Sequence, residues 1–148
     1  MYTVGHSNRS LREFLKILDY CDVSIIVDVH RFPTSRKFPY FKKEVLQAEL
    51  PRHAVGYVWL GKELGGYRNG GYLKYMSSME FSRGISRLVR IIELVRRGYV
   101  AVMCVERFWF KCHRRFIADS LIRHGYEVIH VVDAGWEVRH KFRGYSIK

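Results

Sequence analysis

Hydrophobic residues along this chain fall into short apolar runs separated by longer segments with helical spacing. The runs predict five strands, at residues 2–5, 23–29, 54–60, 99–105 and 126–132. The run at 23–29, VSIIVDV, is β-branched and apolar at nearly every position, which is typical of a central strand in a parallel sheet.

The segments between the predicted strands carry helix signals. Ser10 followed by Glu13 forms a capping box at the start of one helix, whose apolar positions are Leu11, Phe14, Leu15 and Leu18. Ser77 with Glu80 forms a second box and opens a long helix to about residue 97, with apolar positions Ile85, Leu88, Ile92 and Val95. Shorter helices are expected at 42–50 and 112–124, and loops at 30–41 and 61–72.

Strands that alternate with helices predict an α/β fold. We expect a single domain over residues 1–148, with three layers and a mostly parallel sheet of roughly five strands. A chain of this length can bury one hydrophobic core without disulfides or metals.

The charge balance adds a class of partner. Lys and Arg number 26 against 14 Asp and Glu, which gives a net charge of +12. A field of that sign attracts nucleic acid first and phosphorylated small molecules second. A solvated surface, or adaptation to high salt or temperature, explains the charge equally simply. The scarcity of side-chain amides hints at a thermophile; they are only Asn8, Gln47 and Asn69.

The long predicted helix carries a basic stripe opposite its apolar face. This stripe, which we call the arginine stripe, consists of Arg83, Arg87, Arg90 and Arg97. It is either a solvated helix face or a contact to a nucleic-acid backbone.

Other features of the sequence indicate the compartment. No apolar run approaches the ~18 residues of a membrane span, and the first residues lack the layout of a signal peptide. Three cysteines without a Cys-x-x-Cys pair argue against a disulfide framework. We therefore expect a cytoplasmic protein with no membrane partner; its cofactor and oligomeric state stay unknown.

Polar residues gather directly after the predicted strands. Because the carboxyl ends of parallel strands meet at one edge of a sheet, these residues predict a polar cleft there. Loops are polar in general, which is the alternative explanation. The residues concerned are His6, Ser7, Arg9, Asp28, His30, Arg31, Lys62, Glu63, Gly65, Gly66, Cys104, Glu106, His113 and Asp133.

Three of these residues are candidates for catalysis. Glu106 follows a buried strand, where partial burial would raise its pKa into the range useful for acid–base work; an ion pair with Arg114 or Arg9 is the alternative. His6 could carry a proton or be a structural imidazole. Asp28 could orient His6, bind a ribose hydroxyl or cap a helix.

A second set of residues is suited to bind phosphate. Arg114 and Arg115 fall in the first turn of a predicted helix, where free backbone N–H groups and guanidiniums together favour an anion. The full set of expected phosphate or substrate ligands is Ser7, Arg9, Arg31, Arg36, Gly65, Gly66, Cys112, His113 and Arg114.

The cysteines leave alternatives open. Cys112, near a helix start and beside cations, should have a lowered pKa and could be a nucleophile, whereas Cys104 within a strand is expected to be buried and inert. A metal site of Cys104, Cys112 and His113 lacks a recurrent zinc spacing, so no metal is expected. The aromatic run Phe108 to Phe110 is a candidate stacking or partner surface.

These motifs together resemble the domain of unknown function 488 family. The matching elements are T-x-G-H-S-x-R at 3–9, D-V-x-R-x-P-x-S-R at 28–36, E-L-G-G at 63–66, M-C-x-E at 103–106 and C-H-R at 112–114. One departure is His30, which stands where the family usually has Arg. The resemblance implies a small α/β domain with a polar cleft at the strand ends, and no established reaction.

Three functional hypotheses follow. The first is an enzyme that acts on nucleic acid or a nucleotide, with a phosphate-binding basic cleft and hydrolase-type, glycosidic or transfer chemistry by Glu106 and His6. The second is a non-catalytic, basic nucleic-acid-binding module that uses the arginine stripe. The third is thiol-based chemistry through Cys112.

Overall fold

The protein is described by a computed structural model that covers residues 1–32 and 37–142. Over this part of the chain the sheet has six strands: β1 (Tyr2–Gly5), β2 (Val23–Asp28), β3 (Gly56–Trp59), β4 (Tyr99–Cys104), β5 (Ile129–Asp133) and β6 (Trp136–Arg139). Their order is β3-β2-β4-β1-β5-β6, and every neighbouring pair is parallel except β5 with β6.

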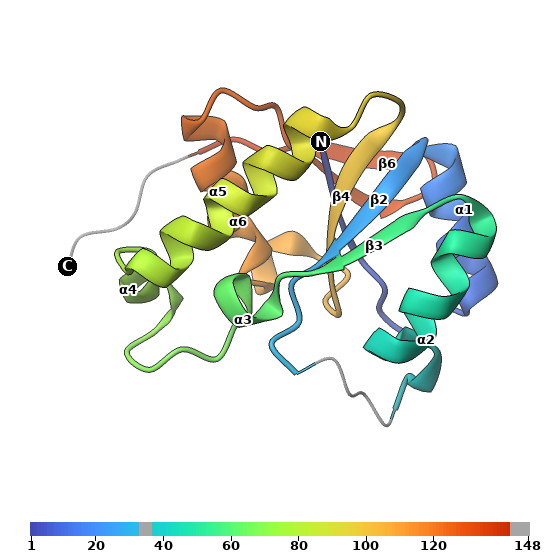
Figure 1. The fold of residues 1–148 in the computed structure, drawn as a ribbon, viewed down its shortest axis with the longest axis horizontal. Coiled ribbons are helices and arrows are strands. Elements are labelled where there is room, and N and C mark those ends of the chain that lie inside the picture. Colours follow the sequence, from blue (N-terminus) through green and yellow to red (C-terminus); the bar gives the residue numbers. More distant parts are fainter. Residues whose placement is uncertain (33–36, 143–148) are drawn as a thin grey trace.

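Helices cover both faces of this sheet. They are α1 (Leu11–Tyr20), α2 (Lys43–Glu49), α3 (Gly61–Leu64), α4 (Tyr72–Tyr75), α5 (Met79–Leu94) and α6 (Arg114–Arg123), with short 3₁₀ segments η1 (Pro39–Phe41), η2 (Leu50–His53) and η3 (Trp109–Lys111). Figure 1 shows α1 and α2 on one side of the sheet and α5 and α6 on the other. The predicted three-layer α/β fold is therefore confirmed. None of the described helices is long and apolar enough to cross a bilayer.

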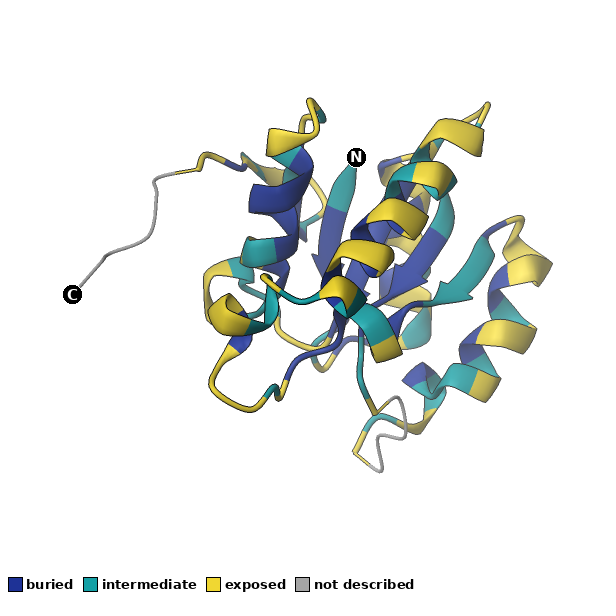
Figure 2. Ribbon diagram, turned by 60° about the vertical axis from the view of Figure 1, so that its left-hand side comes forward, coloured by how far each residue is buried: buried dark blue, intermediate teal, exposed yellow. Residues whose placement is uncertain are grey.

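The core has one cluster on each face of the sheet because side chains alternate along each strand. On β4, Val100, Val102 and Cys104 point to the α5–α6 side, while Ala101 and Met103 pack with α1 and α2. Figure 2 shows the buried central strands between helices whose outer faces are exposed. Cys104 therefore enters the layer that also contains the start of α6.

The helix caps match the sequence at one helix and differ at another. Ser10 caps α1 by accepting a hydrogen bond from the Glu13 N–H at 3.1 Å, as predicted. Ser78, and not Ser77, caps α5 and accepts from the Phe81 N–H at 3.1 Å. The Ser77 N–H instead donates to the Lys74 carbonyl in the turn that follows α4, so the capping role passes to the next serine.

Several boundaries differ from the prediction. The segment 61–72, expected to be a loop, contains the one-turn helix α3. Helix α6 begins at Arg114 because the Cys112 backbone is still extended (φ −137°, ψ 152°). The antiparallel strand β6 was not expected, since WEVR lacks a strand-like apolar run; Gly135, with φ +78°, allows the tight turn that pairs it with β5.

A buried chain of polar side chains joins β1 and β5 to the residue that follows β6 and to α6. Thr3 Oγ1 lies 2.6 Å from His130 Nδ1, His130 Nε2 lies 2.8 Å from His140 Nδ1, and His140 Nε2 lies 2.6 Å from Asp119 Oδ1. The Trp109 ring stacks on His130 at 4.6 Å. Burial, with His140 and Arg114 nearby, holds the pKa of His130 far below its ordinary value, so this imidazole is neutral.

This network predicts a loss of stability in mild acid. Burial also lowers the pKa of His6 to about 4, so both His6 and His130 stay neutral in the fold but take up protons in the unfolded chain below about pH 6.5. Their contribution is complete above that pH and decreases as the pH falls, by about 1.4 kcal/mol per pH unit for each group.

The measurement is the free energy of unfolding from urea titrations at several pH values between about 7 and 5. His130→Gln should reduce the slope of stability against pH, whatever it does to stability at neutral pH. An unchanged slope in that variant would show that His130 is not held neutral.

Candidate functional site

A pocket of about 420 Å³ lies at the carboxyl edge of the sheet. We call it the carboxyl-edge pocket. Three segments line it: the residues after β2, those after α3, and the loop between β4 and α6. The lining residues are His30, Arg31, Phe32, Gly66, Tyr67, Tyr72, Cys104, Val105, Glu106, Lys111, Cys112 and His113.

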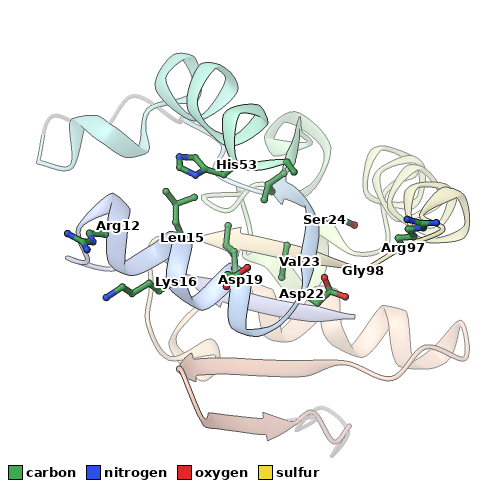
Figure 3. Close-up of a pocket in the computed structure, with 13 residues that line it drawn as sticks. Arg12, Leu15, Lys16, Asp19, Asp22, Val23, Ser24, His53, Arg97 and Gly98 are labelled. Atoms are coloured by element: carbon green, nitrogen blue, oxygen red, sulfur yellow. The ribbon is translucent and has the colours of Figure 1, made fainter.

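A second hollow, of about 880 Å³, lies at the opposite edge of the sheet. Figure 3 shows the residues that line it, which come from α1, the start of β2 and the segments before β3 and β4. Basic Arg12 and Lys16 share it with acidic Asp19 and Asp22. Ligands of parallel α/β sheets bind at the carboxyl ends of the strands, so the carboxyl-edge pocket is the candidate site.

Two glycines let the backbone come close enough to form the pocket. A Cβ on Gly5, at the end of β1, would lie 1.7 Å from the Glu106 carbonyl oxygen, so only glycine permits the β4–α6 loop to rest there. A Cβ on Gly66 would lie 3.2 Å from His113 Nδ1. The E-L-G-G element thus packs directly against the residue that follows Cys112.

The Cys112 sulfur, on the wall of the pocket, has three polar neighbours. It lies 2.6 Å from Cys104 Sγ, 3.5 Å from the Arg114 backbone nitrogen and 3.6 Å from His113 Nδ1. The hydrogen bond from Cys104, together with the His113 ring and Arg114, lowers the pKa of the Cys112 thiol. Burial raises the pKa of Cys104 well above its usual value. These effects favour the negative charge on Cys112 and the proton on Cys104.

His113 is held by a backbone carbonyl. Its Nε2 lies 3.1 Å from the Val29 oxygen, which can only accept, so Nε2 carries a proton, and Nδ1 lies 3.6 Å from the Cys112 sulfur. The Tyr72 ring contacts the imidazole at 5.2 Å between centroids. Cys112 and His113 thus form a thiol–imidazole pair of the kind that activates a nucleophile.

His30 is a pocket residue that had no predicted role of its own. Its Nδ1 lies 2.5 Å from Asp28 Oδ1, and Tyr57 donates to Asp28 Oδ2 at 2.5 Å. His30 Nε2 has no hydrogen-bond partner among the described residues. The sequence carried a signal for this contact, because His30 follows Asp28 by two residues at the end of a strand. By its sequence, however, His30 stands out chiefly as a departure from the family motif.

Asp28 does not orient His6, which was one of the three alternatives left open for this carboxylate. Both are buried, but the Asp28 carboxylate bonds His30 and Tyr57, while His6 Nδ1 donates to the Ser7 carbonyl at 2.9 Å. The His6 ring stacks on Phe41 at 4.0 Å. His6 therefore lies behind the pocket as a neutral, packed imidazole.

Arg9 and Arg114 also lie outside the pocket lining. Both are buried, and their guanidiniums donate to backbone carbonyls: Arg9 to Val132, and Arg114 to Glu106 at 2.5 Å and Arg107 at 3.3 Å. Arg9 also lies 3.7 Å from Asp133. These arginines fix the loops around the site and hold them at the edge of the sheet.

The remaining predicted residues divide in the same way. Glu106 lines the pocket, but it is exposed, so the partial burial expected from the sequence is wrong. Arg114 donates a hydrogen bond to the Glu106 carbonyl and not to its carboxylate. Arg31 lines the pocket and donates to the Tyr67 carbonyl at 2.6 Å. Ser7 and Gly65 support neighbouring loops, and Arg36 lies outside the described residues. The pocket thus brings together Arg31, Gly66, Glu106, Cys112 and His113.

The donor set of the pocket is one of thiols, imidazoles and cations. Within residues 1–32 and 37–142, no group of three or more His, Cys, Asp or Glu side chains is arranged to hold a metal ion. The chemistry that the geometry supports is that of a thiolate in a basic surrounding formed by Arg31, Lys111 and the N-terminus of α6.

The fold and the pocket define a class: a small three-layer α/β domain with a thiol-containing pocket at the carboxyl edge of a parallel sheet. Residues 10–121 match the family described as Domain of unknown function DUF488, and the chain belongs to that family. Comparison with curated proteins and with solved structures gives no match.

The contact between Gly5 and the β4–α6 loop gives a prediction. Gly5→Ala places a methyl group against the Glu106 carbonyl and the Arg107 Cα, so backbone must move. We expect a loss of about 1–3 kcal/mol of stability, measured by urea unfolding.

Gly56→Ala is the matched control, because a Cβ there meets only the flexible Ile25 side chain, at 3.3 Å. Equal stability of the two variants would mean that the close approach at Gly5 does not constrain the loop.

Proposed function

We propose that the protein is an enzyme that uses the Cys112 thiolate as a nucleophile on an anionic, phosphate-bearing substrate of nucleotide or nucleic-acid type. The observation that carries this proposal is the position of Cys112 Sγ: it lies on the wall of a basic pocket, 2.6 Å from a thiol donor and 3.5 Å from the first backbone nitrogen of α6.

The cations of the pocket support the choice of substrate. Arg31 and Lys111 line it, and the N-terminus of α6 adds the partial positive charge of a helix end. The net charge of +12 attracts polyanions toward the whole molecule. A phosphate group in the pocket would place the adjoining part of the substrate beside the Cys112 sulfur.

The residues have distinct roles in this proposal. The Cys112 sulfur attacks the electrophilic centre, the bond from that centre to its leaving group breaks, and the leaving group departs with the bonding electrons, which leaves a covalent intermediate. Water then attacks the same centre, the bond to sulfur breaks, and the Cys112 thiolate is restored. Glu106, an exposed carboxylate on the same pocket, accepts a proton from that water. Asp28 orients His30, whose ring is the second proton-carrying group beside the substrate. Glu106 and His30 thus carry out the acid–base chemistry in this proposal, and the buried His6 packs beside His30.

A lowered pKa of Cys112 predicts alkylation that persists in mild acid. In a Cys21→Ser background, iodoacetamide should modify Cys112 at about pH 6 nearly as fast as at about pH 8, whereas an ordinary thiol is only about 0.3% ionised at the lower pH. Inorganic phosphate should slow the reaction by occupying the pocket, and Lys111→Met should weaken this protection.

Lys16→Met is the matched control, since Lys16 lines the hollow at the other edge of the sheet. A rate that falls tenfold per pH unit below about pH 8 would contradict the thiolate. Protection that is the same in both lysine variants would contradict the anion site.

A second candidate function is nucleic-acid binding without catalysis, and the arginine stripe favours it. Arg83, Arg87 and Arg90 are exposed on α5, although Arg87 also forms an ion pair with Glu63 at 2.9 Å. Cations in a row along a helix are suited to the phosphates of a nucleic-acid backbone.

Neutralising the stripe tests this candidate. The triple variant Arg83→Gln, Arg87→Gln, Arg90→Gln should bind an oligonucleotide more weakly, and the slope of log affinity against log salt should fall by about 2 to 3. A variant with Arg12, Arg52 and Arg139 changed to Gln removes the same charge from other elements. If the two variants lose the same affinity and slope, the stripe is not the binding surface.

A further inference from the structure

Cys104 and Cys112 come from two different elements and meet at the base of one loop. Cys104 is the last residue of β4, and Cys112 precedes the first turn of α6. Their sulfurs are 2.6 Å apart, and neither is in a disulfide. An approach of about 0.6 Å brings them to the ~2.05 Å of a disulfide.

The surrounding contacts hold this pair together. Cys104 is fixed within the hydrogen-bonded ladder of β4 with β1. Arg114, two residues after Cys112, donates to the carbonyls of Glu106 and Arg107 and so ties the start of α6 to the loop that follows Cys104. Bond formation therefore requires little movement of the backbone.

The two thiols differ in the way that a nucleophilic and a resolving cysteine differ. Cys112 is partly exposed on the pocket, where a small solute can reach it, and it carries the negative charge. Cys104 is buried, with 3% of its surface exposed, and it keeps its proton. Oxidants react with thiolates, so the first oxidation falls on Cys112.

We infer that Cys104 and Cys112 form a reversible dithiol–disulfide couple, which a hydroperoxide oxidises and a thiol reductant restores. This inference rests on the proposed function in one respect, because the disulfide removes the nucleophile and so switches the enzyme off.

The reaction balances in two steps. The Cys112 thiolate attacks one peroxide oxygen; an S–O bond forms, the O–O bond breaks, and hydroxide leaves, so that Cys112 becomes a sulfenic acid. The Cys104 sulfur then attacks the Cys112 sulfur; the S–S bond forms, the S–O bond breaks, and the Cys104 proton leaves with the hydroxyl group as water. Sulfur loses two electrons and the peroxide gains them.

Cys21 serves as an internal reference. It lies in the core cluster on the other face of the sheet, with its Sγ 3.7 Å from Glu137 Oε1. Burial and Glu137 raise the pKa of Cys21 to about 12, so this thiol stays protonated. It should not react with peroxide under the conditions that oxidise Cys112.

The experiment treats the whole protein with one equivalent of hydrogen peroxide, then blocks free thiols with iodoacetamide under denaturing conditions and measures the intact mass. We expect a loss of two hydrogen atoms, one alkylated cysteine, and a tryptic map that links Cys104 to Cys112. Dithiothreitol should restore three alkylated cysteines. Cys21→Ser should form the same disulfide.

Cys104→Ser separates the two partners. In this variant Cys112 should be trapped as a sulfenic acid that dimedone captures, with far less dimedone adduct in the wild type. Circular dichroism establishes that the variant is folded. A wild type that gains oxygen at Cys112 while Cys104 remains alkylatable would overturn the inference, and so would a disulfide that includes Cys21.

The same samples distinguish this inference from the proposed function. If the disulfide forms but reduced Cys112 is neither alkylated in mild acid nor protected by phosphate, the couple stands and the enzyme proposal fails. If Cys112 shows both properties but no disulfide forms, the enzyme proposal stands and the couple fails.

Discussion

The buried guanidinium of Arg114 is the interaction on which the site depends. It is 1% exposed and donates to the carbonyls of Glu106 and Arg107. A buried charge is costly unless hydrogen bonds satisfy it, and closure of the loop over Arg114 supplies those of Nη2, whereas its Nε and Nη1 have no partner among the described residues. That closure places Cys112 beside Cys104 and turns the start of α6 toward the pocket.

A second arginine makes the corresponding link on the other side of the loop. Arg9 donates to the Val132 carbonyl and lies beside Asp133, which also pairs with Arg107 at 3.2 Å. Residues that follow β1 and β4 are therefore joined to the end of β5 through guanidiniums. Arg9 and Arg114 donate to the backbone, and the cations that line the pocket beside them are Arg31 and Lys111.

The layers and the parallel strands could be predicted because apolar runs and capping serines are local signals. The place of the site could also be predicted, since strand ends meet at one edge. The roles of single residues could not: whether Arg114 faces an anion or a carbonyl, or whether Asp28 bonds His6 or His30, depends on tertiary contacts. Cys104 was expected to be buried and inert because it lies within a predicted strand. Its position in the sequence does not show how close it lies to Cys112.

The proposed function requires Cys112 to be the reactive thiolate of this protein. The most direct measurement is peptide mapping after treatment of the native, reduced protein with a limiting amount of iodoacetamide at about pH 6. We expect the label on Cys112, with Cys21 and Cys104 unmodified. Label spread over the three cysteines, or found chiefly on Cys21 or Cys104, would contradict it.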